Sequence, residues 1–138
     1  MKNTGLSRLL KTMYAVLCMA AASSCAGFDE EGLFSQVRIV LEFPDGRNAV
    51  LVTVEGDEDV SFFRNINTRR NYDYPLFVNG TGRMTVQKGV YVFGFDAVAD
   101  FGDGTLRRVR SAQHRQPSSS VDLLDGEEEL VVKLTWLD

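Results

Sequence analysis

The stretch QVRIVLEF, residues 36–43, decides the fold of this chain. Apolar and polar residues alternate along it, so every second side chain falls on the same face of an extended strand. One face carries Val37, Ile39, Leu41 and Phe43, and the other carries Arg38 and Glu42. This pattern predicts a β-strand with one face buried and the other in water.

The alternation recurs to the end of the chain, and turn signals such as PDGRN (44–48) and DFGDG (100–104) interrupt it. We expect GRMTVQKG and VYVFGFDAVA to form a hairpin closed at Gln87–Gly89. Strands are predicted within residues 49–55, 60–66, 76–80, 82–89, 90–99, 105–111 and 130–137. No convincing helical pattern of about ten residues occurs there. Roughly seven or eight strands with frequent turns predict an all-β, antiparallel sandwich or barrel.

The first 24 residues have the features of a secretory signal. Lys2, Arg8 and Lys11 precede the apolar run Met13–Ala22, which is too short to cross a membrane because a spanning helix needs about 20 residues. The alternative is a buried helix of a cytosolic domain. Removing residues 1–24 leaves 12 lysines and arginines against 19 acids, a net charge of −7. Such an acidic domain argues against nucleic acid and against electrostatic docking on anionic lipid.

The chain has two cysteines, and only one of them would remain after cleavage. Cys18 lies inside the apolar run, so Cys25 would stand alone near the new N-terminus. Exported proteins normally use cysteines in pairs. Cys25 therefore requires another explanation, which is a free thiol, an intermolecular bridge or acylation.

The sequence Ala22-Ser23-Ser24-Cys25 resembles the lipobox of bacterial lipoproteins, although leucine is commoner than Ala22 at the first position. The resemblance implies that Cys25 becomes a lipidated first residue and anchors the protein to the membrane, since several acyl chains anchor stably. Ordinary cleavage without a lipid is the alternative.

The acids that follow Cys25, in AGFDEEG (26–32), resemble the export signal of surface lipoproteins in Bacteroidetes-type bacteria. That resemblance implies a place on the outer face of the outer membrane. Residues 25–35 are predicted to form an acidic tether, and the alternative is that its acids only keep the tether solvated and that the protein is periplasmic.

Residues 36–138 resemble transthyretin-like (prealbumin-like) sandwich domains. The resemblance rests on Gly82-Arg83, on the turn Lys88-Gly89 and on Tyr91 and Phe93 in the strand that follows. It implies a seven- to eight-stranded antiparallel sandwich, preceded by the signal segment, of a kind common in surface lipoproteins and fimbrial accessory subunits.

The sequence offers little for catalysis. Its one histidine, His114, lies in a polar loop, and GxSxG, HExxH and P-loop motifs do not occur. The acidic turn at 56–59 lacks the spacing of an EF-hand. We therefore expect no enzyme, no cofactor and no metal site.

Two stretches are candidate contact surfaces. The loop NTRRNYDYP supplies Arg69, Arg70, Tyr72 and Tyr74, and the strand TLRRVRS supplies Arg107, Arg108 and Arg110. Arginine and tyrosine are enriched in recognition surfaces. Arginines of the second stretch could instead protect an exposed edge strand.

These observations predict a lipid-anchored, non-enzymatic binding, adhesion or assembly module of the cell envelope. Its partner would be an envelope protein or a glycan. The alternatives are a fimbrial-type subunit that exchanges strands and a small glycan-processing accessory protein.

Overall fold

The computed structural model describes residues 31–112 and 120–137, and this part of the chain is all-β. The signal segment, Cys25 and His114 lie outside it. A 3-10 turn, Glu31–Leu33, precedes the first strand. The strands are β1 (Phe34–Glu42), β2 (Leu51–Val54), β3 (Phe62–Asn65), β4 (Phe77–Val78), β5 (Thr81–Gln87), β6 (Gly89–Gly94), β7 (Asp96–Asp100), β8 (Leu106–Ser111), β9 (Val121–Leu123) and β10 (Glu127–Trp136).

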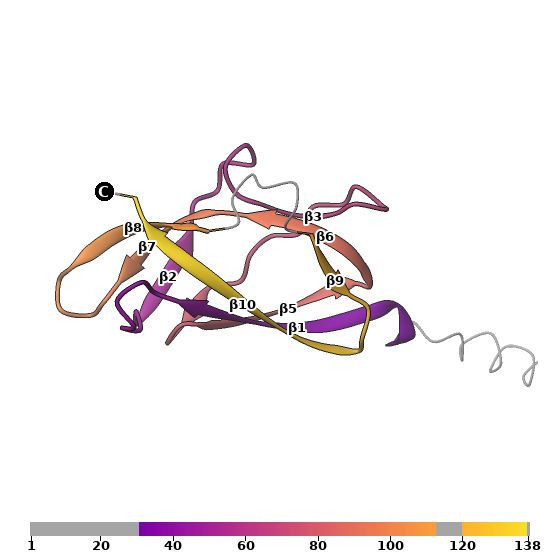
Figure 1. Ribbon diagram of the computed structural model, residues 1–138, viewed down its shortest axis with the longest axis horizontal. Coiled ribbons are helices and arrows are strands. Elements are labelled where there is room, and N and C mark those ends of the chain that lie inside the picture. Colours follow the sequence, from indigo (N-terminus) through magenta and orange to yellow (C-terminus); the bar gives the residue numbers. More distant parts are fainter. Residues whose placement is uncertain (1–30, 113–119, 138) are drawn as a thin grey trace, which may run out of the picture. The chain divides into compact units, whose positions relative to one another are not determined.

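Seven strands form a closed barrel and three form a separate sheet (Figure 1). The barrel has the order β1-β10-β8-β7-β2-β4-β5, and the small sheet has the order β3-β6-β9. Among the strands of the described residues, all pairs are antiparallel except β1 with β10, which run parallel with Ile39 opposite Leu130. The all-β prediction is confirmed, but the expectation of a wholly antiparallel arrangement is wrong at this pair. A parallel pair needs a long crossover, and here the whole domain between the two strands supplies it.

The alternation that predicted the first strand is confirmed. Val37, Ile39, Leu41 and Phe43 are all buried, whereas Arg38 and Glu42 are exposed. β1 begins at Phe34, two residues before the predicted start, and Ser35 is already buried. The last two residues of the predicted tether, Phe34 and Ser35, therefore belong to β1.

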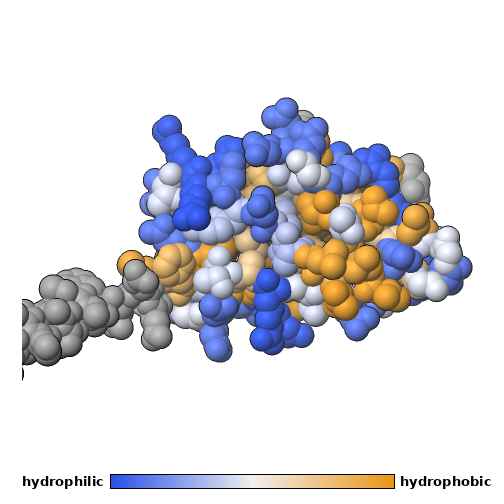
Figure 2. Space-filling model, turned by 180° about the vertical axis from the view of Figure 1, so that it is seen from behind, coloured by the Kyte–Doolittle hydropathy of each residue, from blue (hydrophilic) through white to orange (hydrophobic). Residues whose placement is uncertain are grey.

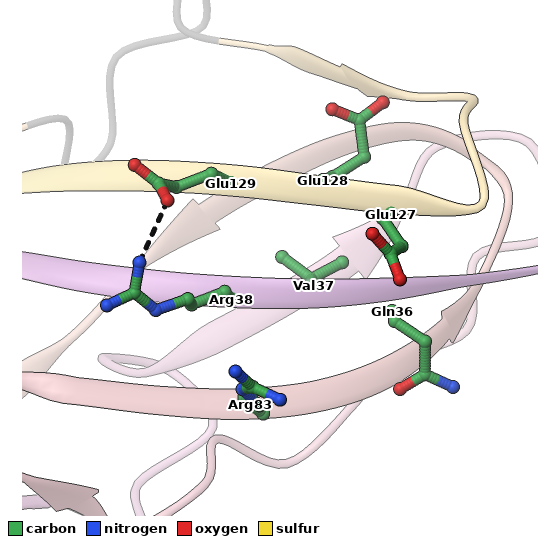
Figure 3. A pocket seen from close by; sticks show the side chains of 7 residues that line it. All are labelled: Gln36, Val37, Arg38, Arg83, Glu127, Glu128 and Glu129. Carbon is green, nitrogen blue, oxygen red and sulfur yellow. Dashed lines mark hydrogen bonds and ion pairs between the residues drawn. The ribbon is translucent and has the colours of Figure 1, made fainter.

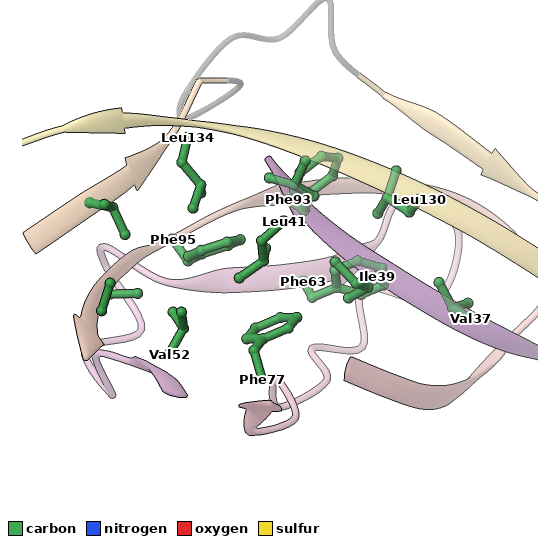
Figure 4. Packing of buried hydrophobic residues seen from close by; sticks show 14 of the residues in the cluster. Val37, Ile39, Leu41, Val52, Phe63, Phe77, Phe93, Phe95, Leu130 and Leu134 are labelled. Atoms are coloured by element: carbon green, nitrogen blue, oxygen red, sulfur yellow. The ribbon is translucent and has the colours of Figure 1, made fainter. Parts of the chain in front are cut away.

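One hydrophobic cluster joins inward side chains of the barrel and of the small sheet. Figure 4 shows Ile39 of β1, Leu130 of β10, Phe63 of β3 and Phe93 of β6 pointing into the same interior. The Phe63 and Phe93 rings have centroids 6.1 Å apart. Fully burying a side chain of this size contributes about 1.5–3 kcal/mol, so this shared core stabilises both sheets.

The predicted hairpin at Gln87–Gly89 does not form. β5 pairs with β1 and β4, whereas β6 pairs with β3 and β9. The chain therefore crosses from the barrel to the small sheet at this point, and the Lys88 amide donates to the Leu33 carbonyl instead of closing a turn. The apolar run 90–99 likewise divides between two sheets, since β6 ends at Gly94 and β7 begins at Asp96.

Two other turns do close hairpins. The DFGDG turn joins β7 to β8 as predicted, and Gly102 and Gly104 have positive φ. Asn79 and Gly80, with φ of 52° and 79°, join β4 to β5 directly, because Val78 pairs with Thr81. Positive φ at both central residues is the mark of a two-residue hairpin turn that matches strand twist.

The outer surface is not uniformly polar. Figure 2 shows apolar side chains gathered on one part of the face it presents. On β2 and β4, Leu51 and Val78 lie opposite each other, and Val78 is 49% exposed. Much of any protein surface is apolar, so exposed apolar side chains such as these identify no partner by themselves.

Candidate functional site

The arginines of β8 are not free contact residues. β8 lies between β7 and β10 in the barrel, so the expectation of an edge strand is wrong. Arg108 makes two hydrogen bonds to Glu55, of 2.8 and 3.0 Å, and Arg110 makes two to Asp96, of 2.7 and 2.8 Å. These carboxylates raise the pKa of both guanidinium groups. The two arginines stabilise the barrel surface, and their guanidinium groups are already engaged by carboxylates.

Arg107 faces the other side of β8. Its guanidinium lies 3.7 Å from the ring centroid of Trp136. Trp136 also contacts Phe43 and Phe101, with centroids 6.0 and 6.1 Å away. A guanidinium over an indole face is held by its attraction to the π-electrons, so Arg107 covers this aromatic cluster at one end of the core.

Tyr74 is a structural residue. Its hydroxyl donates a 2.6 Å hydrogen bond to the Phe62 carbonyl, and its ring packs against Phe63 and Phe95 with centroids 5.7 and 4.8 Å away. Burial raises the pKa of this hydroxyl well above its ordinary value of 10. Tyr74 thus ties the loop to the core, and it also lines a small surface hollow.

The loop that carries Arg69 and Arg70 is fixed from beneath by Asn65. The Asn65 side chain is fully buried, and its oxygen accepts hydrogen bonds from the amides of Asn67 and Thr68, at 2.9 and 3.1 Å. An Asx turn of this kind satisfies the loop backbone locally. Asn65 was not among the predicted site residues, and its signal in the sequence is an asparagine shortly before the polar loop NTRRNYDYP.

A chain of polar contacts continues from Asn65 to Tyr72. The Asn65 side-chain nitrogen donates to the Tyr91 hydroxyl at 3.1 Å, and that hydroxyl donates to the Gln87 carbonyl. The Gln87 amide donates to the Tyr72 hydroxyl at 3.1 Å. The Arg70 guanidinium lies 4.9 Å from the Tyr72 ring centroid. Tyr72 and Arg70 are therefore positioned by the fold, and burial raises the pKa of Tyr91.

The remaining predicted contact residue, Arg69, borders a groove on the outer face of the small sheet. Arg69, with φ of 62°, Arg64, Asn71, Ile66 and Val92 line this groove of about 540 Å³, which we call the arginine groove. Arg64 donates a 3.0 Å hydrogen bond to Asn71, and Ile66 is 48% exposed. No carboxylate is among these lining residues. Guanidinium groups bind carboxylate and phosphate through paired hydrogen bonds, so this groove suits an anionic group with an apolar neighbour.

The predicted contact residues thus do not form one surface. Arg69 and Arg70 belong to the loop after β3 of the small sheet, whereas Arg107, Arg108 and Arg110 belong to β8 of the barrel. Local charge pattern suggested both stretches, but only the structure shows which guanidinium groups already have carboxylate partners.

A second charged groove lies on the outer face of the barrel, across β5, β1 and β10 (Figure 3). This hollow of about 320 Å³ is the barrel groove, and it is lined by Gln36, Val37, Arg38, Arg83, Glu127, Glu128 and Glu129. The proximity of these charges depends on the parallel β1–β10 register, which no local pattern reveals.

A smaller hollow of about 200 Å³ has an acidic lining that includes Glu55, Glu58 and Asp73, together with Ser61 and Tyr72. Of these acids, Glu55 is already held by Arg108. Within residues 31–112 and 120–137, no group of three His, Cys, Asp or Glu side chains is placed to hold a metal ion.

In the part of the chain that the structure describes, no helix has the length and apolar character needed to cross a membrane. Comparisons of the chain with protein-family models, with curated proteins and with solved structures find no match.

Proposed function

We propose that this protein is a lipid-anchored, non-enzymatic binding module of the bacterial cell envelope, held at the outer membrane through Cys25 and exposed on the cell surface. The lipobox-like Ala22–Cys25 and the acids at 29–31 support this location. The all-β body is compatible with the transthyretin-like kinship, which stays a prediction.

The arginine groove is the observation that carries the binding role. Arg64 and Arg69 present guanidinium groups beside the exposed Ile66, and the lining includes no carboxylate that would neutralise them. In a chain with a formal net charge of −4, such a local concentration of positive charge is distinctive. The partner that fits is an acidic protein segment that carries an apolar side chain next to its carboxylate.

The recognition would follow from two contributions. A carboxylate that accepts paired hydrogen bonds from a guanidinium gains about 1.5–3 kcal/mol. An apolar side chain over Ile66 and Val92 adds about 25 cal/mol for each Å² removed from water. Because the loop is already fixed by Asn65, little ordering cost would oppose binding.

Charge reversal in the groove tests this role. Full-length protein and an Arg64→Glu/Arg69→Glu variant are compared for capture of envelope proteins from detergent extracts, over a range of salt concentrations. The matched control is Lys133→Glu on β10, an exposed residue outside the groove. We expect the control to capture as the wild type does and the groove variant to lose a salt-sensitive partner. Equal capture by all three proteins would refute the role of the groove.

The anchor is tested separately by growth with radiolabelled palmitate. We expect label in the wild-type protein and none in Cys25→Ser. Protease treatment of intact cells then reports whether the domain is exposed. Full label in the serine variant would refute anchoring through Cys25 and leave the groove experiment unaffected.

A further inference from the structure

The barrel groove is a second site, and its geometry differs from that of the arginine groove. Positive and negative groups face each other across it, with the arginines on β5 and β1 and the outward carboxylates of Glu127 and Glu129 on β10. Figure 3 shows these side chains side by side over the three strands. The groove therefore has a positive side and a negative side.

The positive side contains an unusual pair. Arg83 of β5 lies directly opposite Arg38 of β1 in the antiparallel ladder. Opposite residues have Cβ atoms about 4.5–5.5 Å apart, and like charges at such positions repel. Arg38 is partly compensated by Glu129, at 3.0 Å. Arg83 makes no hydrogen bond or ion pair within the described residues, so an oxyanion between the two guanidinium groups would relieve the repulsion and satisfy Arg83.

The negative side offers acceptors. Glu127 lies opposite Gln36 in the parallel ladder and has no hydrogen-bond partner among the described residues. Glu129 uses one oxygen for Arg38. Glu128 points away from this side, because neighbouring side chains of a strand alternate, and it accepts a 3.1 Å hydrogen bond from the Asp125 amide.

We propose that the barrel groove binds a short zwitterionic peptide, with its carboxylate between Arg83 and Arg38 and its ammonium group at Glu127 and Glu129. Neighbouring strands lie about 4.8 Å apart, so β5 and β10, on either side of β1, are separated by about 10 Å. A tripeptide spans about 10 Å when extended, at up to about 3.5 Å per residue. The groove volume of about 320 Å³ is large enough for such a ligand. This inference does not depend on the lipid anchor or on the arginine groove.

The test compares three probes on the full-length protein by NMR titration: triglycine, N-acetyl-triglycine and triglycine amide. The groove is open, so we expect a dissociation constant for triglycine in the millimolar range. Amide shifts should be confined to β1, β5 and β10 near the groove. Removing either charge from the peptide should weaken binding at least about fivefold, which corresponds to about 1 kcal/mol.

Two variants then assign the ends of the peptide. Arg83→Gln should abolish the difference between triglycine and its amide, and Glu127→Gln should abolish the difference between triglycine and the acetylated form. Lys133→Gln, on the same strand as Glu127 but outside the groove, should bind as the wild type does. Equal affinity for the three probes, shifts elsewhere, or no binding at tens of millimolar would each overturn the proposal. The probe series on the wild-type protein decides the matter even if a variant fails to fold.

Discussion

Gly89 packs against Asn65 so closely that a Cβ built on the glycine would lie 2.6 Å from the Asn65 side-chain nitrogen. That nitrogen donates to Tyr91, and the oxygen of the same amide accepts from two loop amides. The amide therefore has no room to move without breaking these bonds. The first position of β6 therefore requires a residue without a Cβ.

Gly89→Ala is expected to lower the free energy of unfolding by about 1–3 kcal/mol, because overpacking forces buried groups out of position. Chemical denaturation measures this change. Gly56→Ala is the matched control, since nothing lies within 4 Å of a Cβ at that position. Equal losses in the two variants would show that the contact with Asn65 is not the cause.

Asn65→Ala is expected to destabilise the protein by about 1–3 kcal/mol, because the amides of Asn67 and Thr68 lose their acceptor and the Tyr91 hydroxyl loses one of its hydrogen bonds. Amide hydrogen exchange of residues 66–70 should also accelerate. In Asn67→Ala, an exposed position, stability should change by less than about 0.5 kcal/mol. Unchanged exchange in the Asn65 variant would contradict its role as the support of the arginine groove.

Stability should fall in alkaline solution. Burial raises the pKa of Tyr74 and Tyr91 in the folded state, so above pH 10 the unfolded chain loses protons that the folded protein keeps. The contribution of these hydroxyls is thus complete below pH 10 and decreases as the pH rises, by up to about 1.4 kcal/mol per pH unit for each tyrosine.

The measurement is the denaturation midpoint from pH 8 to pH 11.5. Tyr74→Phe should be less stable at pH 8, where it lacks the hydrogen bond to Phe62, but should lose less stability as the pH rises. Parallel curves for the variant and the wild type would show that Tyr74 does not contribute to the alkaline transition.

The two ion pairs of the barrel surface should differ in their effect on stability. The Asp96 carboxylate in the Arg110 pair is only 4% exposed, whereas Glu129 in the Arg38 pair is 57% exposed. Removing Arg110 takes the guanidinium away from a buried carboxylate, whereas removing Arg38 takes it away from a hydrated one. We expect Arg110→Met to lower the melting temperature clearly more than Arg38→Met does, and a reversed order would contradict this interpretation.

The local sequence pattern predicted the positions of the strands better than it predicted which strands pair. The alternation at 36–43 identified the buried face of β1, and a strand was also predicted within 130–137, where Leu130, Val132 and Leu134 of β10 are buried. No local signal reveals that these two strands pair in parallel. The run Gln87–Gly89 has the composition of a hairpin turn, yet the close packing of Gly89 on Asn65 is a tertiary contact that composition does not encode.

In the candidate site, too, the sequence predicted local features but not tertiary contacts. The sequence singled out Arg69, and the arginine groove contains it. It also singled out Arg108 and Arg110, whose carboxylate partners lie 53 and 14 residues away in the chain. Whether an arginine is free depends on such partners, so charge pattern alone overstated the contact surface. Arg83 was overlooked as a binding residue because its significance comes from the neighbouring strands.

The pairing of β1 with β10 has a consequence for how the barrel forms. Arg38 and Glu129, which meet across this seam, are 91 residues apart. Closing so long a loop is entropically unfavourable and slows folding. On the ribosome, β1 must also wait until almost the entire domain has been made, so its edge toward β10 stays open during synthesis. The interval before this seam closes is when the nascent chain is most exposed to chaperones and to mispairing.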